Sequence, residues 1–579
     1  MVVVYNKENE LKCIIEQAMD DIEEKKKDIS ENLSNNEEYS SLRESVKANE
    51  TAIEQIKMKI GNLEQLRSDD TKKKKCEYTN AKLDFQKKLI SYYDNEVYVS
   101  IQPLQHEMKK SHIADVYVPL DYTVERSVID DFENKGQFPA ERRNEIMHSS
   151  LHDVLTKEGK CAKRIFVLGE AGSGKSWFCK NLVYCWRLAH TADKNHNNLQ
   201  VVDDMNEMKK FEFLFYINLC QYLYKDNTDD TIKETYGQPI LNTILETDSG
   251  NCLVILDGLD EWLPLSSNIL HPKHGHLKNY TIILTSRPWK LASFPDIERY
   301  QIVHLNGLNT KAVDKIISIS VPLLNQVLKT KRSSEDCKTV ITQSSISDVK
   351  RLPIYLQQLI CLWFDDKLQG TSRCAVYSGL LDLLLVWHRK KNQTDAEVSS
   401  MYKKSENLVN IKLPSHLSRF QSCEFNKYPI QNISWLACEM LFNETPVLDS
   451  FTLRRKMISD EVKHTCLRIG ILVKGRSTIL SVSAPQQTSY SFVNKSVQEF
   501  LAAVYIAINF ETLDELKEKN IYLAKCKTGQ HISMYSAVFV MLCGLKPSFA
   551  MHISKYIYNV ALGDEIINTY RTKVQGKCR

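Results

Sequence analysis

The stretch Gly169-Glu170-Ala171-Gly172-Ser173-Gly174-Lys175-Ser176 decides the fold that we expect for this chain. A short apolar run, residues 164–168, precedes it, and apolar residues at helical spacing follow it over residues 178–186. A strand, a glycine-rich loop and a helix with the spacing G-x-x-x-x-G-K-S are typical of a phosphate-binding loop. The alternative, a chance glycine-rich turn, does not account for the strand and helix that flank it.

The residue types of this loop suit a bound phosphate. Its glycines let several backbone N–H groups face one phosphate without a Cβ in the way, and the following helix adds the positive end of its dipole. Lys175 is expected to reach the outer phosphates, and the Ser176 hydroxyl is expected to bind Mg²⁺. We therefore predict that residues 169–176 together bind a nucleoside triphosphate.

Length and composition indicate a soluble protein with several domains. A chain of 579 residues is too long for one core. The net charge of +4 is too small to indicate a nucleic-acid-binding surface, and no apolar run reaches the ~18–20 residues that span a bilayer. The 16 cysteines include no C-x-x-C pair, so zinc and thioredoxin-type sites are not supported. With no secretory signal at the start, a reduced, cytoplasmic protein is expected.

Residues 1–95 are predicted to form a helical or coiled-coil region. One seam of a heptad pattern takes Leu42, Asn49, Ile56 and Leu63, and the other takes Val46, Ile53, Ile60 and Arg67. Six of these eight positions are apolar, which supports a coiled coil or a helical hairpin. The seam spans only about four heptads, so self-association through it is one of two interpretations. An amphipathic helix packed on its own domain is an equally good interpretation. The basic run at residues 72–75 is interpreted as a solvated helix face or loop.

A connector, residues 96–160, is expected to lead into a nucleotide-binding domain at residues 161–310. Apolar strands are predicted at residues 211–217, 252–256, 281–285 and 301–305, alternating with helical segments. This alternation indicates an α/β domain with a parallel sheet and helices on both faces. The strand at 211–217, placed between the loop strand and the Asp257 strand, suggests the branch of ATPases in which another strand separates these two motif strands.

The rest of the chain is predicted to be mainly helical. We expect a helical domain at residues 311–395, a winged-helix domain at 396–490 and a second helical domain at 491–579. The winged-helix prediction is based on a helical stretch at residues 453–467 and on three short extended runs, at residues 470–473, 478–482 and 490–493. No repeat of 20–30 residues is found.

Charged side chains at the ends of the predicted strands complete the candidate site. Asp257 ends an apolar strand, where its carboxylate suits Mg²⁺. Asp260 and Glu261 follow within one turn, and a carboxylate there could orient or deprotonate an attacking water. Arg287, after the next strand, is expected to contact the terminal phosphate. The alternatives are charges at a helix start for Asp260 and Glu261 and a structural salt bridge for Arg287.

Four motifs, in order, resemble those of NACHT-domain proteins, the signal-transduction ATPases that include animal NOD-like receptors. The phosphate loop is joined by residues 253–261, LVILDGLDE; residues 285–288, TSRP; residues 352–353, LP; and residues 491–503, SFVNKSVQEFLAA. The resemblance covers residues 160–545. It implies that ATP or ADP with Mg²⁺ is the cofactor and that Pro353 packs near the adenine.

The chain departs from the family pattern in two places. Where the family commonly has a histidine that contacts the β-phosphate of ADP, this chain has Asn494, whose amide donates a hydrogen bond but carries no charge. The locked ADP state is therefore expected to be weaker. The chain also ends soon after the helical region without a repeat sensor, as a short form or a fragment would.

The resemblance implies a molecular switch. ADP would hold the domains closed, and exchange for ATP would favour an open form that oligomerises and gathers the amino-terminal helices for a downstream protein. An innate-immune or cell-death role would follow, with slow hydrolysis at most. Two rivals are a motor or remodelling ATPase of another branch and a scaffold whose nucleotide never exchanges. A DNA-binding winged helix is not expected, because no basic recognition helix stands out.

Overall fold

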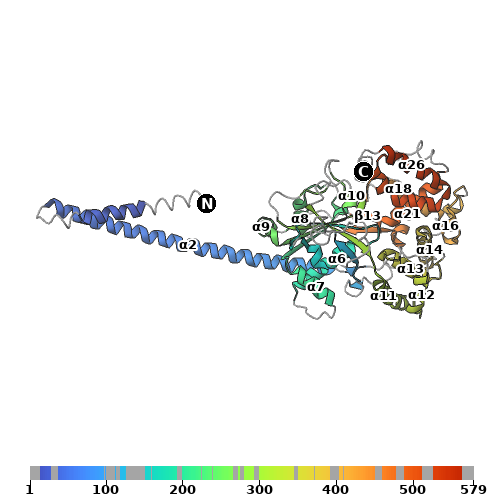
Figure 1. Cartoon of the computed structure of the whole chain (residues 1–579), viewed down its shortest axis with the longest axis horizontal. Helices are drawn as coiled ribbons and strands as arrows, with labels where there is room; N and C mark the ends of the chain where they lie inside the picture. The colour runs from blue at the N-terminus through green and yellow to red at the C-terminus, as the bar shows by residue number, and fades with distance from the viewer. Residues whose placement is uncertain are drawn as a thin grey trace, which may run out of the picture. The chain divides into compact units, whose positions relative to one another are not determined.

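In a computed structural model the chain forms two compact units, residues Met1–Phe85 and Gln86–Arg579 (Figure 1). The described residues are 14–27, 37–96, 98–99, 111–112, 118–124, 150–157, 159–191, 199–222, 225–237, 239–264, 271–273, 279–291, 299–343, 350–368, 370, 372–391, 403–408, 410–449, 459–476, 488–510 and 526–563.

The first unit contains an antiparallel pair of helices. Residues 14–27 are helical, and they run beside the first part of α2 (Glu37–Glu96). Lys57 of α2 contacts the sulfur of Met19, and Glu50 of α2 forms an ion pair with Lys26. A later residue of the first helix therefore contacts an earlier residue of α2, so the two helices run antiparallel. This is the geometry of a helical hairpin, one of the two forms predicted for this region. Self-association through it stays a prediction.

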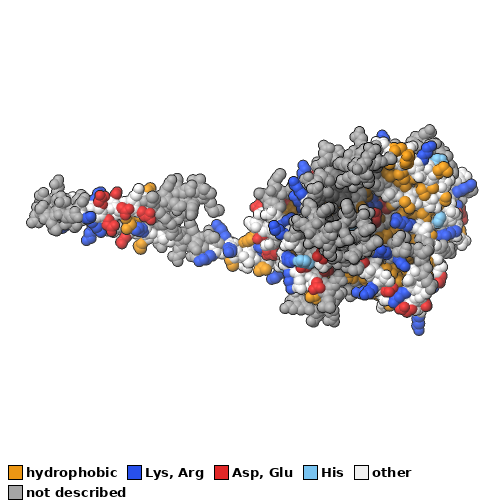
Figure 2. Space-filling view, in the orientation of Figure 1, with side chains coloured by type: hydrophobic (Ala, Val, Ile, Leu, Met, Phe, Trp, Pro, Cys, Tyr) orange, Lys and Arg blue, Asp and Glu red, His pale blue; other side chains and the backbone are white. Residues whose placement is uncertain are grey.

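The heptad seams of α2 differ in burial. Val46 is buried and Ile53 half-buried, whereas Asn49 and Ile56 are exposed. The side chains at positions 42, 60, 63 and 67 lie outside those described. Residues 72–75 are exposed, and Figure 2 shows basic and acidic side chains interspersed along this unit, as a solvated helix surface would have.

The second unit is built on a six-stranded sheet with the order β3-β10-β6-β9-β8-β7. Neighbours from β10 to β7 are parallel, and β3 pairs antiparallel with β10. The strands are β3 (Asp121–Val124), β6 (Arg164–Leu168), β7 (Phe213–Asn218), β8 (Cys252–Asp257), β9 (Thr281–Ser286) and β10 (Gln301–Gly307). The predicted α/β class with a mainly parallel sheet is confirmed.

A strand does separate the two motif strands, but it is not the one that the sequence indicated. The separating strand is β9, which pairs with β6 on one side and β8 on the other. The predicted strand, β7, instead lies at the edge beyond β8. Every residue of β8 and β9 is buried, which fits their central positions, whereas β7 is buried at alternate positions toward its end.

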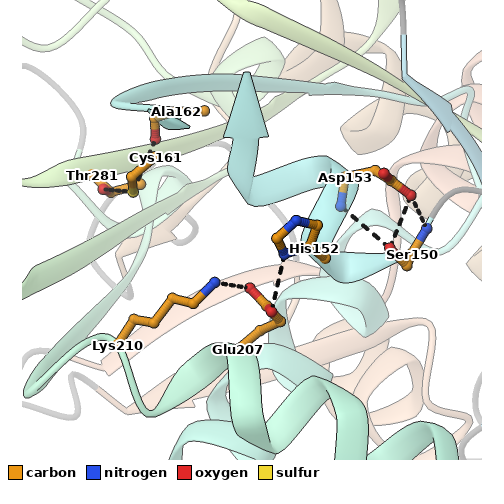
Figure 3. A network of polar contacts seen from close by, with 8 residues as sticks. All are labelled: Ser150, His152, Asp153, Cys161, Ala162, Glu207, Lys210 and Thr281. Carbon is orange, nitrogen blue, oxygen red and sulfur yellow. Dashed lines mark hydrogen bonds and ion pairs between the residues drawn. The ribbon is translucent and has the colours of Figure 1, made fainter. Parts of the chain in front are cut away.

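The connector contributes to the nucleotide domain, which its sequence did not indicate. Besides β3, it supplies α5 (Leu151–Leu155), β4 (Thr156–Lys157) and β5 (Lys160–Cys161). Figure 3 shows His152 of α5 and Lys210 both bonded to Glu207, near the end of α7 (Leu199–Met208). Residues 150–161 are thus tied to the domain that follows them.

Helices dominate the rest of the second unit. Around the sheet lie α6 (Lys175–Ala189), α8 (Thr228–Tyr236), α9 (Ile240–Thr247) and α10 (Pro288–Leu291). The next group is α11 (Thr310–Leu328), α12 (Ser334–Gln343), α13 (Pro353–Phe364) and α14 (Arg373–Lys391). Later helices are α16 (Ser415–Ser418), α17 (Gln421–Phe425), α18 (Lys427–Phe442), α21 (Lys495–Asn509), α24 (Gly529–Met534), α25 (Ser536–Leu545) and α26 (Ala550–Gly563).

A second sheet matches the predicted helix-and-hairpin outline. Helix α20 (Asp460–Arg468) precedes β12 (Leu472–Arg476), which pairs antiparallel with β13 (Thr488–Phe492). A short strand, β11 (Leu448–Asp449), pairs with the other side of β13. The predicted extended run at residues 478–482 lies outside the described residues. In the described part of the chain, no helix has the length and apolarity to cross a bilayer.

Candidate nucleotide site

A cavity of ≈ 390 Å³ lies where the parallel strands end, and its walls come from distant parts of the chain. The phosphate loop and the ends of β7 and β8 form one side. The start of α13 and the segment from β13 into α21 form the other. Among the predicted site residues, those lining it are Ala171, Gly172, Gly174, Lys175, Ser176, Asp257, Asp260, Glu261, Arg287, Pro353 and Asn494.

Two glycines allow the loop to curl against α13. Gly172 and Gly174 have φ values of +79° and +101°, a left-handed conformation that costs other residues energy. A Cβ at Gly172 would overlap Ile354 Cγ2, and one at Gly174 would lie 2.7 Å from Leu120 Cδ1. The glycines therefore set both the loop conformation and its contact with the helical region.

Lys175 begins α6 and faces the cavity. Its Nζ donates to the backbone carbonyls of Gly169 (2.7 Å) and Glu170 (3.2 Å). Burial lowers the pKa of Lys175, while the carboxylate of Asp260 opposes that shift. Gly169, Glu170 and Ser173 do not themselves line the cavity; Glu170 is exposed, and Ser173 is buried beneath the loop.

Asp257 is fixed by two hydroxyl groups at the end of β8. Its Oδ1 accepts from Thr285 Oγ1 (2.6 Å), and its Oδ2 accepts from Tyr216 Oη (3.1 Å). The Gly258 N–H in turn donates to Thr285 Oγ1 (2.9 Å). Asp257 and Ser176 line the same cavity and offer the hard oxygen ligands that Mg²⁺ prefers, so these two residues fit the ion.

Arg287 lies between two carboxylates and is buried with them. Its Nε is 3.1 Å from Asp260 Oδ2, and its Nη1 donates to Glu499 Oε1 at 2.6 Å. Although burial disfavours the charge, Glu499 and Asp260 hold the pKa of Arg287 above its usual value. The salt bridge considered as the alternative role of Arg287 is therefore present, and it joins β9 to α21.

The two adjacent carboxylates differ in their proton affinity. Burial alone would raise the pKa of Asp260, but Lys175 and Arg287 outweigh it, so this pKa is lowered. For Glu261, burial raises the pKa despite the opposing charge of Lys495. The two carboxylates therefore lie in different electrostatic environments, and the direction of each shift makes Glu261 the better proton acceptor of the two.

Three helices of more than ten residues begin at the cavity within the described residues. Gly174 is the N-cap of α6, Pro353 is the first residue of α13, and Asn494 is the N-cap of α21. The Asn494 side chain accepts from the Val497 N–H at 2.8 Å. Helix N-termini carry positive partial charge, so their convergence favours an anionic ligand.

Sequence reasoning missed several residues of this site. Glu499 and Lys495 lie in the motif at residues 491–503 and Thr285 in the motif at residues 285–288, but neither motif predicts their contacts in the site. Tyr216 lies in a predicted strand and in no motif. A signal existed for Glu499, because a charge inside an apolar helix requires a partner. A tyrosine in an apolar strand carries no such signal.

Comparison with known protein families identifies the domain that carries this site. A family model described as NACHT domain matches residues 163–320. The chain contains a NACHT domain. Among curated proteins, none matches the chain. NACHT domains are P-loop NTPases, so residues 163–320 form a nucleotide-binding domain. The matched range contains the phosphate loop, Asp257 and Arg287, but not Pro353, Asn494 or Glu499.

Gly172→Ala should weaken nucleotide binding. The positive φ costs a residue with a side chain about 1–2 kcal/mol, so the free loop of the variant should move out of this conformation. Binding must then restore it, which should lower the affinity by up to roughly tenfold. The overlap with Ile354 adds to this, so a second change, Ile354→Ala, should recover part of the loss. Titration with a fluorescent nucleotide measures both effects. Gly250→Ala is the matched control, because a Cβ there meets no atom within 4 Å; equal affinity of the Gly172→Ala and parent proteins would contradict the prediction.

Proposed function

We propose that this NACHT-domain protein is a switch in which exchange of ADP for ATP, with Mg²⁺, controls oligomerisation. One observation carries the proposal: the cavity is walled both by the nucleotide-binding loop and by residues 491–496 and 498, which run from the end of β13 into α21. A ligand bound there contacts both regions, so its affinity depends on how they are arranged. A ligand shifts an equilibrium only through such a difference in affinity.

Arg287 supplies a reason for the two nucleotides to act differently. In the arrangement described, its charge is balanced by Asp260 and Glu499. Arg287 would be attracted by a γ-phosphate, and Glu499 would be repelled by it. The γ-phosphate of ATP would thus compete with Glu499 for Arg287, whereas ADP would leave the Arg287–Glu499 ion pair intact.

The ion pair would supply part of the differential affinity that such a switch requires. Reversing a two-state equilibrium from 1:99 to 99:1 takes about 5.5 kcal/mol of differential affinity. Breaking a buried ion pair by removing one partner costs about 3–5 kcal/mol. Arg287 is 6 % exposed and Glu499 1 % exposed, so the pair is buried enough for such values.

Slow hydrolysis would reset the switch, with the site residues in distinct roles. Ser176 and Asp257 would hold Mg²⁺, which when bound polarises the phosphate oxygens. Lys175 would contact the outer phosphates, and Glu261 would orient and deprotonate the attacking water. Pro353 would pack near the adenine and Asn494 near the β-phosphate, as in the family that the chain resembles.

Wider roles follow from the same resemblance. NACHT domains commonly oligomerise, and we infer that oligomerisation brings the amino-terminal helices together for a downstream protein. An innate-immune or cell-death function in the cytoplasm is the corresponding cellular role. The described cysteines form no disulfide, which fits a reducing compartment.

Lys175→Ala should abolish nucleotide binding, because the loop loses its only side-chain cation facing the phosphates. Fluorescent-nucleotide titration is expected to show at least a tenfold loss of affinity. Lys180→Ala, on the same helix but outside the cavity, is the control and should bind as the parent does. Unchanged affinity in Lys175→Ala would reject the phosphate site.

Glu261→Gln should slow ATP turnover by about 10²–10⁴-fold, the usual contribution of a general base, and leave ATP binding in place. Because burial raises the pKa of Glu261, parent turnover should decline, as the pH is lowered, at a higher pH than an ordinary glutamate would give. Single-turnover assays over a pH series test this. Glu246→Gln, an exposed change on α9, is the control; parental rates in Glu261→Gln would exclude it as the base.

Glu499→Gln should favour the oligomer, because Arg287 loses the partner that joins it to α21. Size-exclusion chromatography with light scattering is run in ADP and in a non-hydrolysable ATP analogue. The variant is expected to assemble at lower analogue concentration than the parent, or already in ADP. Glu335→Gln removes an exposed ion pair with Lys338 and should behave as the parent does. If Glu499→Gln has parental mass at every nucleotide concentration, the ion pair does not hold the switch.

A further inference from the structure

The carboxylate expected at the metal is bonded to a tyrosine that no motif contains. Tyr216 lies on β7, in register next to Ile255 of β8, two residues before the end of that strand. Its hydroxyl donates to Asp257 Oδ2 at 3.1 Å, while Thr285 donates to Oδ1 at 2.6 Å. Each oxygen of Asp257 thus has its own donor, on strands to either side of β8.

These two hydrogen bonds determine how Asp257 faces the cavity. Asp257 is 4 % exposed, so water cannot readily replace a lost partner. A carboxylate that binds a metal needs one orientation, and the groups that hydrogen-bond to metal ligands typically account for about 10–100-fold in metal affinity. Tyr216 is therefore placed to affect the metal without touching it.

The backbone of Tyr216 is itself held by two other tyrosines. Its N–H lies 3.0 Å from Tyr93 Oη and 2.9 Å from Tyr236 Oη, and Tyr236 Oη donates to its carbonyl at 2.8 Å. Tyr93 Oη donates to the carbonyl of Leu214 at 2.9 Å. Since β7 is the edge strand, these hydroxyls bond backbone groups that a further strand would otherwise pair.

The tyrosine cluster is rigidly packed. Tyr93 and Tyr236 have no exposed surface, and their hydroxyl oxygens are 2.7 Å apart. The ring of Tyr236 packs edge-on against Phe215, and that of Tyr93 packs edge-on against Trp186. Tyr93 comes from the last turn of α2, within the second unit, and Tyr236 from the end of α8.

We propose that Tyr216 is a positioning residue for Mg²⁺: its hydroxyl orients Asp257, and Tyr93 and Tyr236 hold Tyr216 in place. The inference rests on the proposed function, because it takes Asp257 to be a magnesium ligand. It also connects the end of α2 to that ligand through consecutive hydrogen bonds, from Tyr93 to Tyr216 and from Tyr216 to Asp257. By linkage, a change at the end of α2 that alters this cluster alters Mg²⁺ affinity, and Mg²⁺ acts back on the cluster.

The test measures how nucleotide binding depends on Mg²⁺, in the full chain with a fluorescent ATP analogue. In Tyr216→Phe the ring remains and only the hydroxyl is lost. The Mg²⁺ concentration for half-maximal enhancement of binding should rise about tenfold, and affinity measured in excess EDTA should be unchanged. Tyr93→Phe should shift the Mg²⁺ requirement in the same direction by a smaller factor. Tyr222→Phe, which loses a hydroxyl bonded to Thr235 away from Asp257, is the control and should match the parent.

Each other result contradicts a defined part of the inference. A parental Mg²⁺ requirement in Tyr216→Phe overturns the positioning role. An equal loss of affinity with and without Mg²⁺ makes the hydroxyl merely structural, which also overturns it. A shift in Tyr216→Phe with none in Tyr93→Phe removes the connection to α2. If the parent binds nucleotide without any Mg²⁺ response, the metal site of the proposed function fails first, and that failure is visible without the variants.

Discussion

The buried position of Arg287 between Asp260 and Glu499 is the constraint on which the rest of the second unit depends. A guanidinium that is 6 % exposed must have its charge balanced within the protein, because an unpaired buried charge costs several kcal/mol. Asp260 belongs to the turn after β8, and Glu499 to the second turn of α21. The ion pairs therefore fix α21 against the carboxyl ends of the central strands β8 and β9, although Arg287 and Glu499 are 212 residues apart in the chain.

The glycine-rich loop imposes a second constraint of a different kind. Without side chains at Gly172 and Gly174, Ile354 and Leu120 pack directly on the loop backbone. The loop is thus covered by α13 on one side and by the residue preceding β3 on the other. Any ligand that changes the loop conformation must also change these contacts. The two glycines therefore couple the loop conformation to the positions of Ile354 and Leu120.

The sequence predicted those features that depend on local patterns. The phosphate loop, the strand ending at Asp257 and the helix-and-hairpin outline near residue 470 all follow from spacing within a few residues. The position of β9 between β6 and β8 does not, because strand order depends on how the crossovers pack over the whole sheet. The same holds for β3, whose four residues pair with a strand 180 positions away.

The missed site residues have a common physical cause. Tyr216 alternates within an aromatic, apolar strand, and from sequence alone its hydroxyl cannot be assigned to Asp257 rather than to solvent. Glu499 was detectable as a charge in an apolar helix, but its partner was not, since Arg287 lies 212 positions earlier. Side chains that bridge separate elements become visible only when the elements are placed.

Asn494 shows how the chain compensates for a neutral residue where a cation is common in the family. Its Oδ1 is committed to the N–H of Val497, so the residue serves first as the N-cap of α21. That cap secures the helix start at the cavity wall, and a helix start carries roughly half a positive charge. Lys495, the next residue, lines the same cavity and adds a positive side chain. The positive potential at this wall of the cavity therefore does not require a charged residue at position 494; it arises from the helix that Asn494 caps, the same helix whose Glu499 pairs with Arg287.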